Sequence, residues 1–472
     1  MTHTDQLLYH EINYQDPLLI FNIFVNENWS MFLDSADSSK VLNNMNRYSF
    51  IVFDPFIKIT YNNSIITCND VKYTCTNPFE FLRTIFQNYS FQRIPGLPPF
   101  QGGAVGYFSY DLCHFLEKVQ YPKYNDMNFD DMAIGIYDTV ISFDHKLKKA
   151  WIVSSGFSET NSAKQKIRAT ERINSVVERI SIYKPLPSIN FCPLTPESIT
   201  SNFSEEFYIN TVKKVIEYIR SGDIFEANLS QRFQAVLPSY IDPFQLYIKV
   251  RKKNPSPFAS YIKVNETIIA STSPERFLLL KDSIVETRPI KGTCARSSNS
   301  TKDYILAQTL KNSIKDNAEN VMIVDLMRND LSKICEDGSI SVPQLCGLET
   351  FVNVHHLVSV VTGKIKPQFN SIDLLEACFP GGSITGAPKI RSMQIISELE
   401  SYRRGAYCGS IGYIGFDNSL DTSIVIRTYV IKGKFITFNA GGAIVIDSDP
   451  VKEYQETIVK AQALLNVLLN EE

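Results

Sequence analysis

The stretch GAYCGSIGYIGFDNSLDTSIVIRT, residues Gly405–Thr428, carries the apolar runs that decide the fold of the C-terminal half. Strand-like runs occupy Ile411–Phe416 and Ile424–Ile431, and a third occupies Phe258–Val264. Between them lie segments in which apolar residues recur every three or four positions, as in amphipathic helices. These segments are Glu205–Ser221, Tyr304–Cys335, Ala387–Glu400 and Val451–Leu469. The alternation predicts a mixed α/β layout.

The first half of the chain has a different pattern. From residue 7 to about residue 153, short apolar runs such as Ser49–Phe53 and Ile136–Phe143 are separated by turn-rich pieces, which predicts mostly strands. The segment Ser162–Ile182 is rich in charged residues and is predicted to be a helix. The next stretch, Tyr183–Asn202, is rich in Pro, Ser, Thr and Asn and is the best linker candidate. We therefore predict an N-terminal subdomain over 1–183, a linker over 184–203 and a catalytic domain over 204–472.

Composition narrows the class of protein. The formal net charge is -3 and the charges are interspersed, so no long-range field favours nucleic acid or an anionic membrane as partner. The nine cysteines are scattered singly without a CxxC pair, which argues against disulfides or structural zinc and favours a reducing cytoplasm. The N-terminus lacks a signal-peptide pattern, and no run of about 18 apolar residues occurs. We expect a cytoplasmic protein with no membrane contact.

The segment GGSITGAPK, Gly381–Lys389, places glycines and hydroxyls just before a helix with Pro388 at an early position. Free backbone N–H groups at helix N-termini bind anions, so the segment suits a carboxylate or phosphate. The alternative is an ordinary capped helix after a tight turn. A Walker A loop is excluded, because Gly386 is followed by Ala387 and not by lysine.

Two helices carry acidic pairs with three-residue spacing. Glu453 and Glu456 share one polar face of the last helix with Lys460, and Asp316 and Glu319 begin another helix. Magnesium prefers oxygen ligands and keeps several waters, so one carboxylate from each of two facing helices would suit it. The alternative is that both faces are solvated, with Glu456 and Lys460 as an ordinary helix ion pair.

Lys291 lies in ETRPIKGTCAR, between Pro289 and Gly292, where the backbone is a fixed turn or a strand end. An exposed cation is the ordinary explanation for such a lysine. A lysine held near Arg288 and partly desolvated would instead lose its proton more easily and act as a nucleophile. Glu275, in the preceding SPERF segment, would supply an acid if burial raised its pKa.

His356 follows another histidine in NVHHLVSV, and the default explanation is a buried hydrogen-bonding residue. A zinc site is not indicated, because the six histidines of the chain show no HExxH spacing.

Many ordered motifs together resemble the chorismate-utilising family. The order and spacing match from about Ser204 to the C-terminus, and PFQGGAVGYFSYDL (Pro99–Leu112) extends the likeness into the first half. The motifs are GDIFEANLSQRF, SPERF, RPIKGT, DLMRNDL, HLVS, FPGGSITGAPK, the opening stretch Gly405–Thr428 and EYQET. The family contains component I of anthranilate synthase, component I of aminodeoxychorismate synthase, and the isochorismate and salicylate synthases.

The resemblance implies an α/β (α+β) fold. Its expected form is a four-layer α/β/β/α sandwich, in which two large antiparallel sheets pack face to face with helices outside. Two intertwined subdomains would build it, and the active site would open between them.

The resemblance also implies roles for individual residues. Glu319 and Glu456 would bind Mg²⁺, with Asp316 and Glu453 adjoining them. Chorismate carries two carboxylates, so cations suit its pocket. The residues expected to line that pocket are Tyr407, Arg427, Lys460, Gly442 and Ala443, with Ser383 and His356 near the reacting ring.

Two positions separate the branches of the family. In members that add water, a lysine acting as general base occupies the place of Asn228, and anthranilate synthases typically read Pro-Ile-Ala-Gly-Thr where this chain has Lys291. Asn228 together with Lys291 resembles the aminodeoxychorismate synthase branch, which leads to p-aminobenzoate and folate. There the lysine adds at C2 of chorismate, Glu275 would protonate the departing 4-hydroxyl, and ammonia attacks C4. The alternatives are anthranilate synthase component I and a catalytically inactive binding subunit.

Ammonia needs a source, and no cysteine lies in the Gly-x-Cys-x-Gly context of a glutaminase nucleophile. The implied partner is a separate glutamine amidotransferase subunit. The resemblance also suggests a tryptophan pocket near the segments LDSAD and NPSPF, formed by Ser35, Arg47, Tyr48, Pro257 and Phe258.

Overall fold

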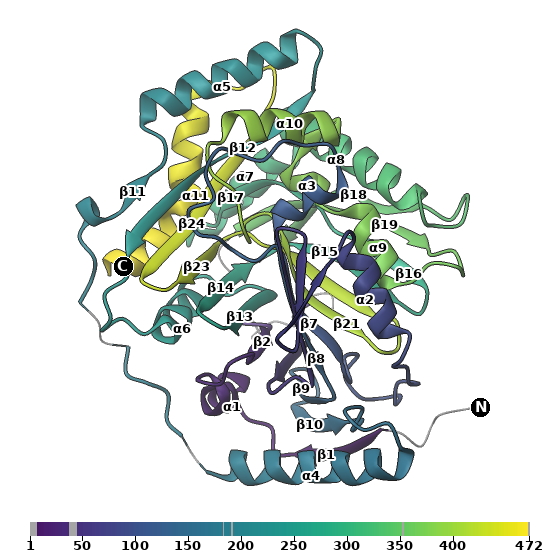
Figure 1. Cartoon of the computed structure of the whole chain (residues 1–472). Helices are drawn as coiled ribbons and strands as arrows, with labels where there is room; N and C mark the ends of the chain where they lie inside the picture. Colours follow the sequence, from purple (N-terminus) through teal and green to yellow (C-terminus); the bar gives the residue numbers. More distant parts are fainter. Residues whose placement is uncertain (1–6, 37–44, 183, 190–191, 352–353, 471–472) are drawn as a thin grey trace.

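Two large antiparallel sheets form the centre of the computed structural model, which describes residues 7–36, 45–182, 184–189, 192–351 and 354–470 (Figure 1). Each sheet has 12 strands within these residues. Helices cover the two outer faces. The α/β/β/α sandwich expected from the sequence is therefore confirmed.

The first sheet, sheet A, combines strands from both halves of the chain. Its order is β1-β10-β9-β3-β2-β13-β14-β23-β24-β12-β11, and β20 pairs with β12. The strands are β1 (Leu8–Ile12), β2 (Met31–Asp34), β3 (Tyr48–Val52), β9 (Thr139–Asp144), β10 (Lys149–Ser154), β11 (Thr200–Ser201), β12 (Glu226–Val236), β13 (Phe258–Val264), β14 (Thr267–Ser273), β20 (Gly386–Ala387), β23 (Thr428–Lys432) and β24 (Phe435–Ile444).

Sheet B is equally mixed. Its order is β17-β19-β16-β15-β22-β21-β7-β8-β4-β5-β6, and β18 pairs with β19. The strands are β4 (Ile57–Asn62), β5 (Ile65–Cys68), β6 (Val71–Thr74), β7 (Gly103–Phe108), β8 (Met132–Tyr137), β15 (Arg276–Lys281), β16 (Ile284–Thr287), β17 (Ile290–Ala295), β18 (Ser341–Thr350), β19 (Val354–Lys364), β21 (Ser410–Gly415) and β22 (Leu420–Ile424).

The helices are capped mainly by side chains of Asn, Asp and Ser, which satisfy the free N–H groups of the first turn. The α-helices are α1 (Pro17–Phe24), α2 (Pro78–Phe86), α3 (Cys113–Leu116), α4 (Ser162–Ser181), α5 (Glu205–Arg220), α6 (Pro243–Lys253), α7 (Ser300–Lys311), α8 (Ile314–Ser332), α9 (Ser371–Cys378), α10 (Lys389–Leu399) and α11 (Pro450–Leu469). Single 3-10 turns occupy Tyr110–Leu112, Pro196–Ser198 and Gly382–Ile384. No described helix is long and apolar enough to cross a bilayer.

Separate apolar cores join the layers. The core between the sheets takes side chains from both, such as Ile262 and Val264 of sheet A and Val105 and Tyr413 of sheet B. Successive side chains of a strand point to opposite faces, so Tyr261 instead joins the core beneath α1, α6 and α11. A third core lies between sheet B and helices α2, α8 and α9.

Two apolar runs that look like single strands are each two strands in different sheets. The run Ile136–Phe143 divides at Asp138 between β8 of sheet B and β9 of sheet A. The run Ile424–Ile431 divides around Arg427, which has a φ of 52° and separates β22 of sheet B from β23 of sheet A. The single-strand prediction was wrong here, because the chain crosses between two buried sheets without a polar turn.

The predicted helix Tyr304–Cys335 is also divided. Asn312 ends α7, and the Ser313 side chain accepts a hydrogen bond from the backbone N–H of Asp316 and begins α8. The helix predicted to start at Ala387 starts at Lys389, since Pro388 is its N-cap. The three remaining predicted helices lie within one or two residues of their expected bounds, and the 184–203 linker stays a prediction.

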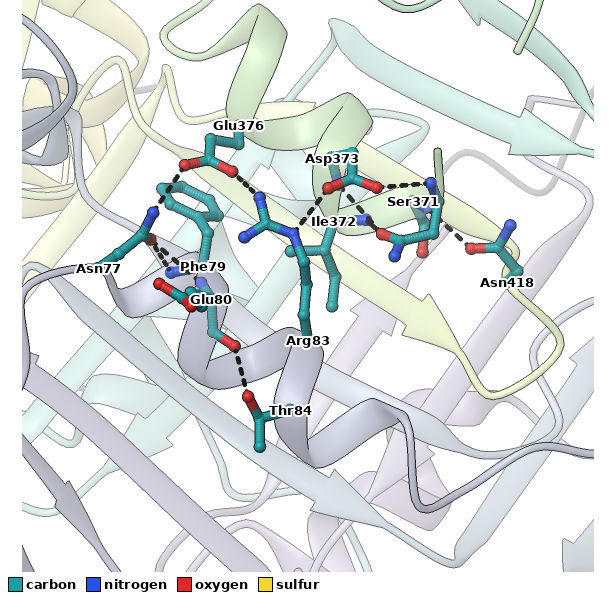
Figure 2. Close-up of polar contacts among 11 residues, drawn as sticks. Asn77, Phe79, Glu80, Arg83, Thr84, Ser371, Ile372, Asp373, Glu376 and Asn418 are labelled. Atoms are coloured by element: carbon teal, nitrogen blue, oxygen red, sulfur yellow. Dashed lines mark hydrogen bonds and ion pairs between the residues drawn. The ribbon is translucent and has the colours of Figure 1, made fainter. Parts of the chain in front are cut away.

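A polar cluster joins the N-terminal half to the C-terminal half through α2 and α9 (Figure 2). The Arg83 guanidinium binds Asp373 with an Nε–Oδ1 distance of 2.6 Å and also pairs with Glu376. Asn77 caps α2 and donates to Glu376, while Asp373 closes a capping box at the start of α9. The segment after α9 carries Ser383, so this cluster fixes one side of the predicted site.

We expect Arg83→Met to lower the free energy of unfolding by about 1–2 kcal/mol, because two half-buried carboxylates lose a shared partner. Urea denaturation measures the change. Arg328→Met is the matched control, since Arg328 forms an exposed pair with Asp325 on α8, and it should change stability by less than about 0.5 kcal/mol. Equal effects of the two substitutions would contradict a special role for the α2–α9 cluster.

Candidate active site

Lys291 is a buried residue at the start of β17 and is only 8% exposed. Its Nζ donates a hydrogen bond of 2.6 Å to Oε1 of Glu226, the first residue of β12. Glu226 is fully buried, and its Oε2 has no hydrogen-bond partner among the described residues. The pair therefore links sheet B to sheet A inside the protein.

The environment of Lys291 differs from the expected one. Arg288 pairs with Glu349, and Glu226 is the ion-pair partner of Lys291. Burial alone would lower the pKa of Lys291, but the Glu226 and Glu319 carboxylates outweigh burial and raise the pKa above that of an ordinary lysine. The raised pKa contradicts the prediction of an easily deprotonated lysine beside Arg288.

Glu275 lies where the chain crosses from β14 to β15. It is 5% exposed, and Ser383 Oγ donates a 2.6 Å hydrogen bond to its Oε1. Burial raises the pKa of Glu275 to about 7, although Ser383, the Ile290 N–H, Lys291 and Lys460 all favour the charged form. Burial thus raises the pKa of Glu275 as the sequence analysis required, and its role as an acid stays a prediction.

Ser383 does not stand at a helix N-terminus. It belongs to the 3-10 turn Gly382–Ile384, six residues before α10 begins at Lys389. The Lys389 ammonium is occupied by Asp330 and by two backbone carbonyls of the same loop. In the structure, Ser383 donates its hydrogen bond to Glu275. An anion site at the start of α10 remains a prediction.

The acidic residues of α8 and α11 face each other. Lys315 of α8 contacts both helices, with Nζ 3.8 Å from Glu319 Oε1 and 3.3 Å from Glu453 Oε1. Asp316 packs against Gly292, where a Cβ would lie 3.0 Å from the Asp316 Cβ. Gly292 also has a φ of 82°, so glycine is required for α8 to approach the strand of Lys291.

These carboxylates suit a hard cation. Glu319 Oε1 and Glu453 Oε2 are buried and have no hydrogen-bond partner among the described residues. Gly442 leaves a hollow beside them, since a Cβ there would lie 3.3 Å from Glu456 Oε1 and 3.4 Å from Glu453 Oε2. Within the described part of the chain, no group of three acidic, His or Cys side chains is placed to hold a metal ion by itself. Magnesium, which keeps waters and uses few protein ligands, fits this open oxygen set.

His356 and Arg427 form another side of the site. Burial and the neighbouring Arg427 lower the pKa of His356 to about 3, so the imidazole is neutral. Its Nδ1 is 2.7 Å from Thr293 Oγ1, and its Nε2 is buried without a hydrogen-bond partner among the described residues. Arg427 is half-buried at the crossing from β22 to β23, and desolvation lowers its pKa. Both side chains have donors or acceptors to spare for a polar ligand.

Lys460 completes the polar face of α11. Its Nζ donates to the Gly441 carbonyl at 2.9 Å and lies 2.6 Å from Glu456 Oε1. It also acts electrostatically on Glu275. The expected gathering of Glu453, Glu456 and Lys460 on one face is confirmed, and that face meets β24.

Asn228 and Ala443 are opposite each other in the β12–β24 ladder. The Asn228 carbonyl accepts a hydrogen bond from Arg404, and its Nδ2 is buried without a partner among the described residues. Tyr407 is buried near the Arg404 guanidinium. Catalytic or binding roles for these residues stay predictions.

Glu226 is the residue that sequence reasoning missed. It stands two positions before Asn228 in the same GDIFEANLSQRF motif, and it, rather than Asn228, contacts Lys291. The sequence did offer a signal, because Glu226 is a carboxylate at the start of a mostly apolar strand. A buried charge needs a partner of opposite charge, so a nearby Lys or Arg could have been expected.

A cavity of about 650 Å³, which Arg288 also lines, lies between the two sheets. All five residues of the predicted tryptophan pocket line it: Ser35, Arg47, Tyr48, Pro257 and Phe258. The structure thus brings the five together, while tryptophan as the ligand stays a prediction.

Comparison with known proteins gives consistent similarities. The model of the family described as chorismate binding enzyme matches residues 34–466. Component 1 of aminodeoxychorismate synthase from Salmonella typhimurium is 39% identical over 451 residues, covering 94% of this chain and 93% of that protein. Anthranilate synthase component 1 from Acetivibrio thermocellus is 34% identical, covering 96% and 93%. The crystal structure of anthranilate synthase component I from Streptococcus pneumoniae matches with a TM-score of 0.79 and 32% identity, covering 89% and 92%.

Proposed function

The chain belongs to the family of chorismate binding enzymes, and we propose that it acts as the chorismate-aminating component I of an aminodeoxychorismate synthase. The reaction would convert chorismate and ammonia to 4-amino-4-deoxychorismate and water. The observation that carries the proposal is a buried lysine, Lys291, in one site with a carboxyl group of raised pKa, Glu275. The similarity to several aminodeoxychorismate synthase components supports the same branch.

The first step forms a covalent bond between the Lys291 nitrogen and C2 of chorismate. Lys291 must first lose a proton, and the Glu226 carboxylate at 2.6 Å is the neighbouring acceptor. As the new bond forms, the ring double bonds shift and the C4–O bond breaks. Glu275 gives its proton to the leaving hydroxyl, which departs as water, and Ser383 then donates its hydrogen bond to the carboxylate that remains.

The second step reverses the shift. The electron pair of ammonia forms a bond to C4, the double bonds move back, and the C2–N bond breaks with its electron pair returning to Lys291. The Glu275 carboxylate takes the proton that the new amine loses, and Glu226 returns its proton to Lys291. The acid, the base and the nucleophile are then restored for another cycle.

Charged side chains would hold the two carboxylates of the substrate. Arg427 and Lys460 bring positive charge to the site, and the neutral His356 offers its unpartnered Nε2 as a further polar contact. Glu319 and Glu456 would hold Mg²⁺, with Asp316 and Glu453 adjoining, and the charge it supplies when bound neutralises the ring carboxylate.

Ammonia would come from a separate glutamine amidotransferase subunit. The chain has no cysteine in the Gly-x-Cys-x-Gly context of such an enzyme. The relatives named above are likewise designated component 1 of their enzymes. Ammonium salts would replace this partner in an assay.

A product assay tests the proposal. The protein is incubated with chorismate, MgCl₂ and excess ammonium, and the products are separated and identified by mass spectrometry and fluorescence. We expect a non-aromatic amino product and no pyruvate. Fluorescent anthranilate with release of pyruvate would instead identify anthranilate synthase activity, and absence of any chorismate turnover would favour a binding subunit.

A further inference from the structure

Lys315 places a positive charge between the acidic groups of α8 and α11. Its Nζ lies 3.3 Å from Glu453 Oε1 and 3.8 Å from Glu319 Oε1. The side chain of Lys315 is 48% exposed, whereas those of Glu319 and Glu453 are 11% and 4% exposed. The ammonium therefore reaches from the solvent side into the space where the two helices present their carboxylates.

The same carboxylates are those with spare oxygens. Glu319 Oε1 and Glu453 Oε2 have no hydrogen-bond partner among the described residues, and Gly442 keeps the adjoining space open. Without a nearby cation, buried carboxylates would repel one another and lose hydration. Lys291 and Lys460 supply part of this positive charge, at Glu319 and Glu456, and Lys315 adds a cation that contacts both Glu319 and Glu453.

We propose that Lys315 is a placeholder cation, which neutralises the acidic site in the metal-free protein and competes with Mg²⁺ for it. The inference rests on the magnesium site of the proposed function. It assigns Lys315 no contact with the reacting atoms, so Lys315 is a positioning residue for the metal ligands.

Displacement of Lys315 follows from charge and geometry. Mg²⁺ binds oxygens at about 2.0–2.1 Å in a nearly octahedral shell, which leaves no room for an ammonium between the same carboxylates. Two cations a few ångströms apart also repel each other. Because Lys315 has a flexible stem and is half exposed, its ammonium would move into water when the metal enters.

The test measures metal binding without chorismate. MgCl₂ is titrated into the protein by isothermal calorimetry, and the midpoint of thermal unfolding is followed from EDTA to millimolar Mg²⁺. Lys315→Met should bind Mg²⁺ about tenfold more tightly, because a competing charge is lost. In EDTA, Lys315→Met should unfold at a lower temperature than the wild type. Added Mg²⁺ should raise its midpoint of thermal unfolding by more than it raises that of the wild type.

Two variants serve as controls. Lys452→Met makes the same charge change on an exposed residue beside Glu453 that forms no ion pair among the described residues, and its Mg²⁺ affinity should change less than twofold. Lys315→Arg keeps the charge and should bind Mg²⁺ as the wild type does. Equal or weaker binding by Lys315→Met, equal tightening by Lys452→Met, or no Mg²⁺ binding by any variant would overturn the inference. None of these outcomes depends on which product chorismate gives.

Discussion

Replacing Lys291 with methionine should lower the rate of 4-amino-4-deoxychorismate formation by a factor of about 10³ or more. The nitrogen that bonds to C2 in the proposed mechanism is then absent, and the two-step route becomes a single displacement with a much higher barrier. The measurement is the rate of chorismate consumption and product formation with saturating ammonium. A trace of anthranilate is the expected residual product, since direct amination at C2 does not need the lysine.

A control must separate chemistry from folding. Lys291→Met alone leaves the fully buried Glu226 charge without its partner, which costs about 3–5 kcal/mol of stability. The double variant Lys291→Met/Glu226→Gln removes both charges and should recover most of that stability while staying inactive. Recovery of activity in the double variant, or an unchanged product and rate in the single one, would remove Lys291 from its role.

Glu275→Gln should reduce the rate by about 10²–10⁴, the usual contribution of a general acid. Glutamine keeps the size of the side chain and still accepts the Ser383 hydrogen bond, but it has no proton to give to the departing hydroxyl. The measurement is kcat for chorismate at pH 6.5, with circular dichroism to verify the fold. Full activity of Glu275→Gln would show that another group protonates the leaving oxygen.

The pH dependence follows from the pKa of about 7 of Glu275. In the proposed mechanism the protonated acid is the active form, and its fraction is high below pH 7 and declines as the pH rises through 7. We expect the rate of the wild type to show this decline and the residual rate of Glu275→Gln not to show it. Ser383→Ala should shift the decline to higher pH, because the Ser383 hydrogen bond favours the carboxylate.

Sequence patterns predicted those helices and strands whose caps and apolar spacing lie within the segment itself. Residue periodicity located α4, α5 and α11, and β13 has the predicted bounds, because caps and apolar spacing lie within each segment. The gathering of acidic residues from α8 and α11 rested on the resemblance, since no local signal shows that two helices face each other.

The sequence could not show where the chain changes sheets. Asp138 and Arg427 interrupt apolar runs that are buried on both sides, so neither position has the polar turn that normally marks a strand end. The Lys291–Glu226 pair was missed for a related reason. Its two members are 65 residues apart in the chain and meet only when sheet A and sheet B pack together.

The mixed strand order of the sheets has a consequence for biosynthesis. Asp34 of β2 pairs with Ala259 of β13, and Phe108 of β7 pairs with Ser410 of β21. While the chain leaves the ribosome, these early strands have open edges and uncovered apolar faces until much later segments emerge. Such long-range pairing slows folding, so the nascent N-terminal half is a natural client for chaperones that shield strand edges.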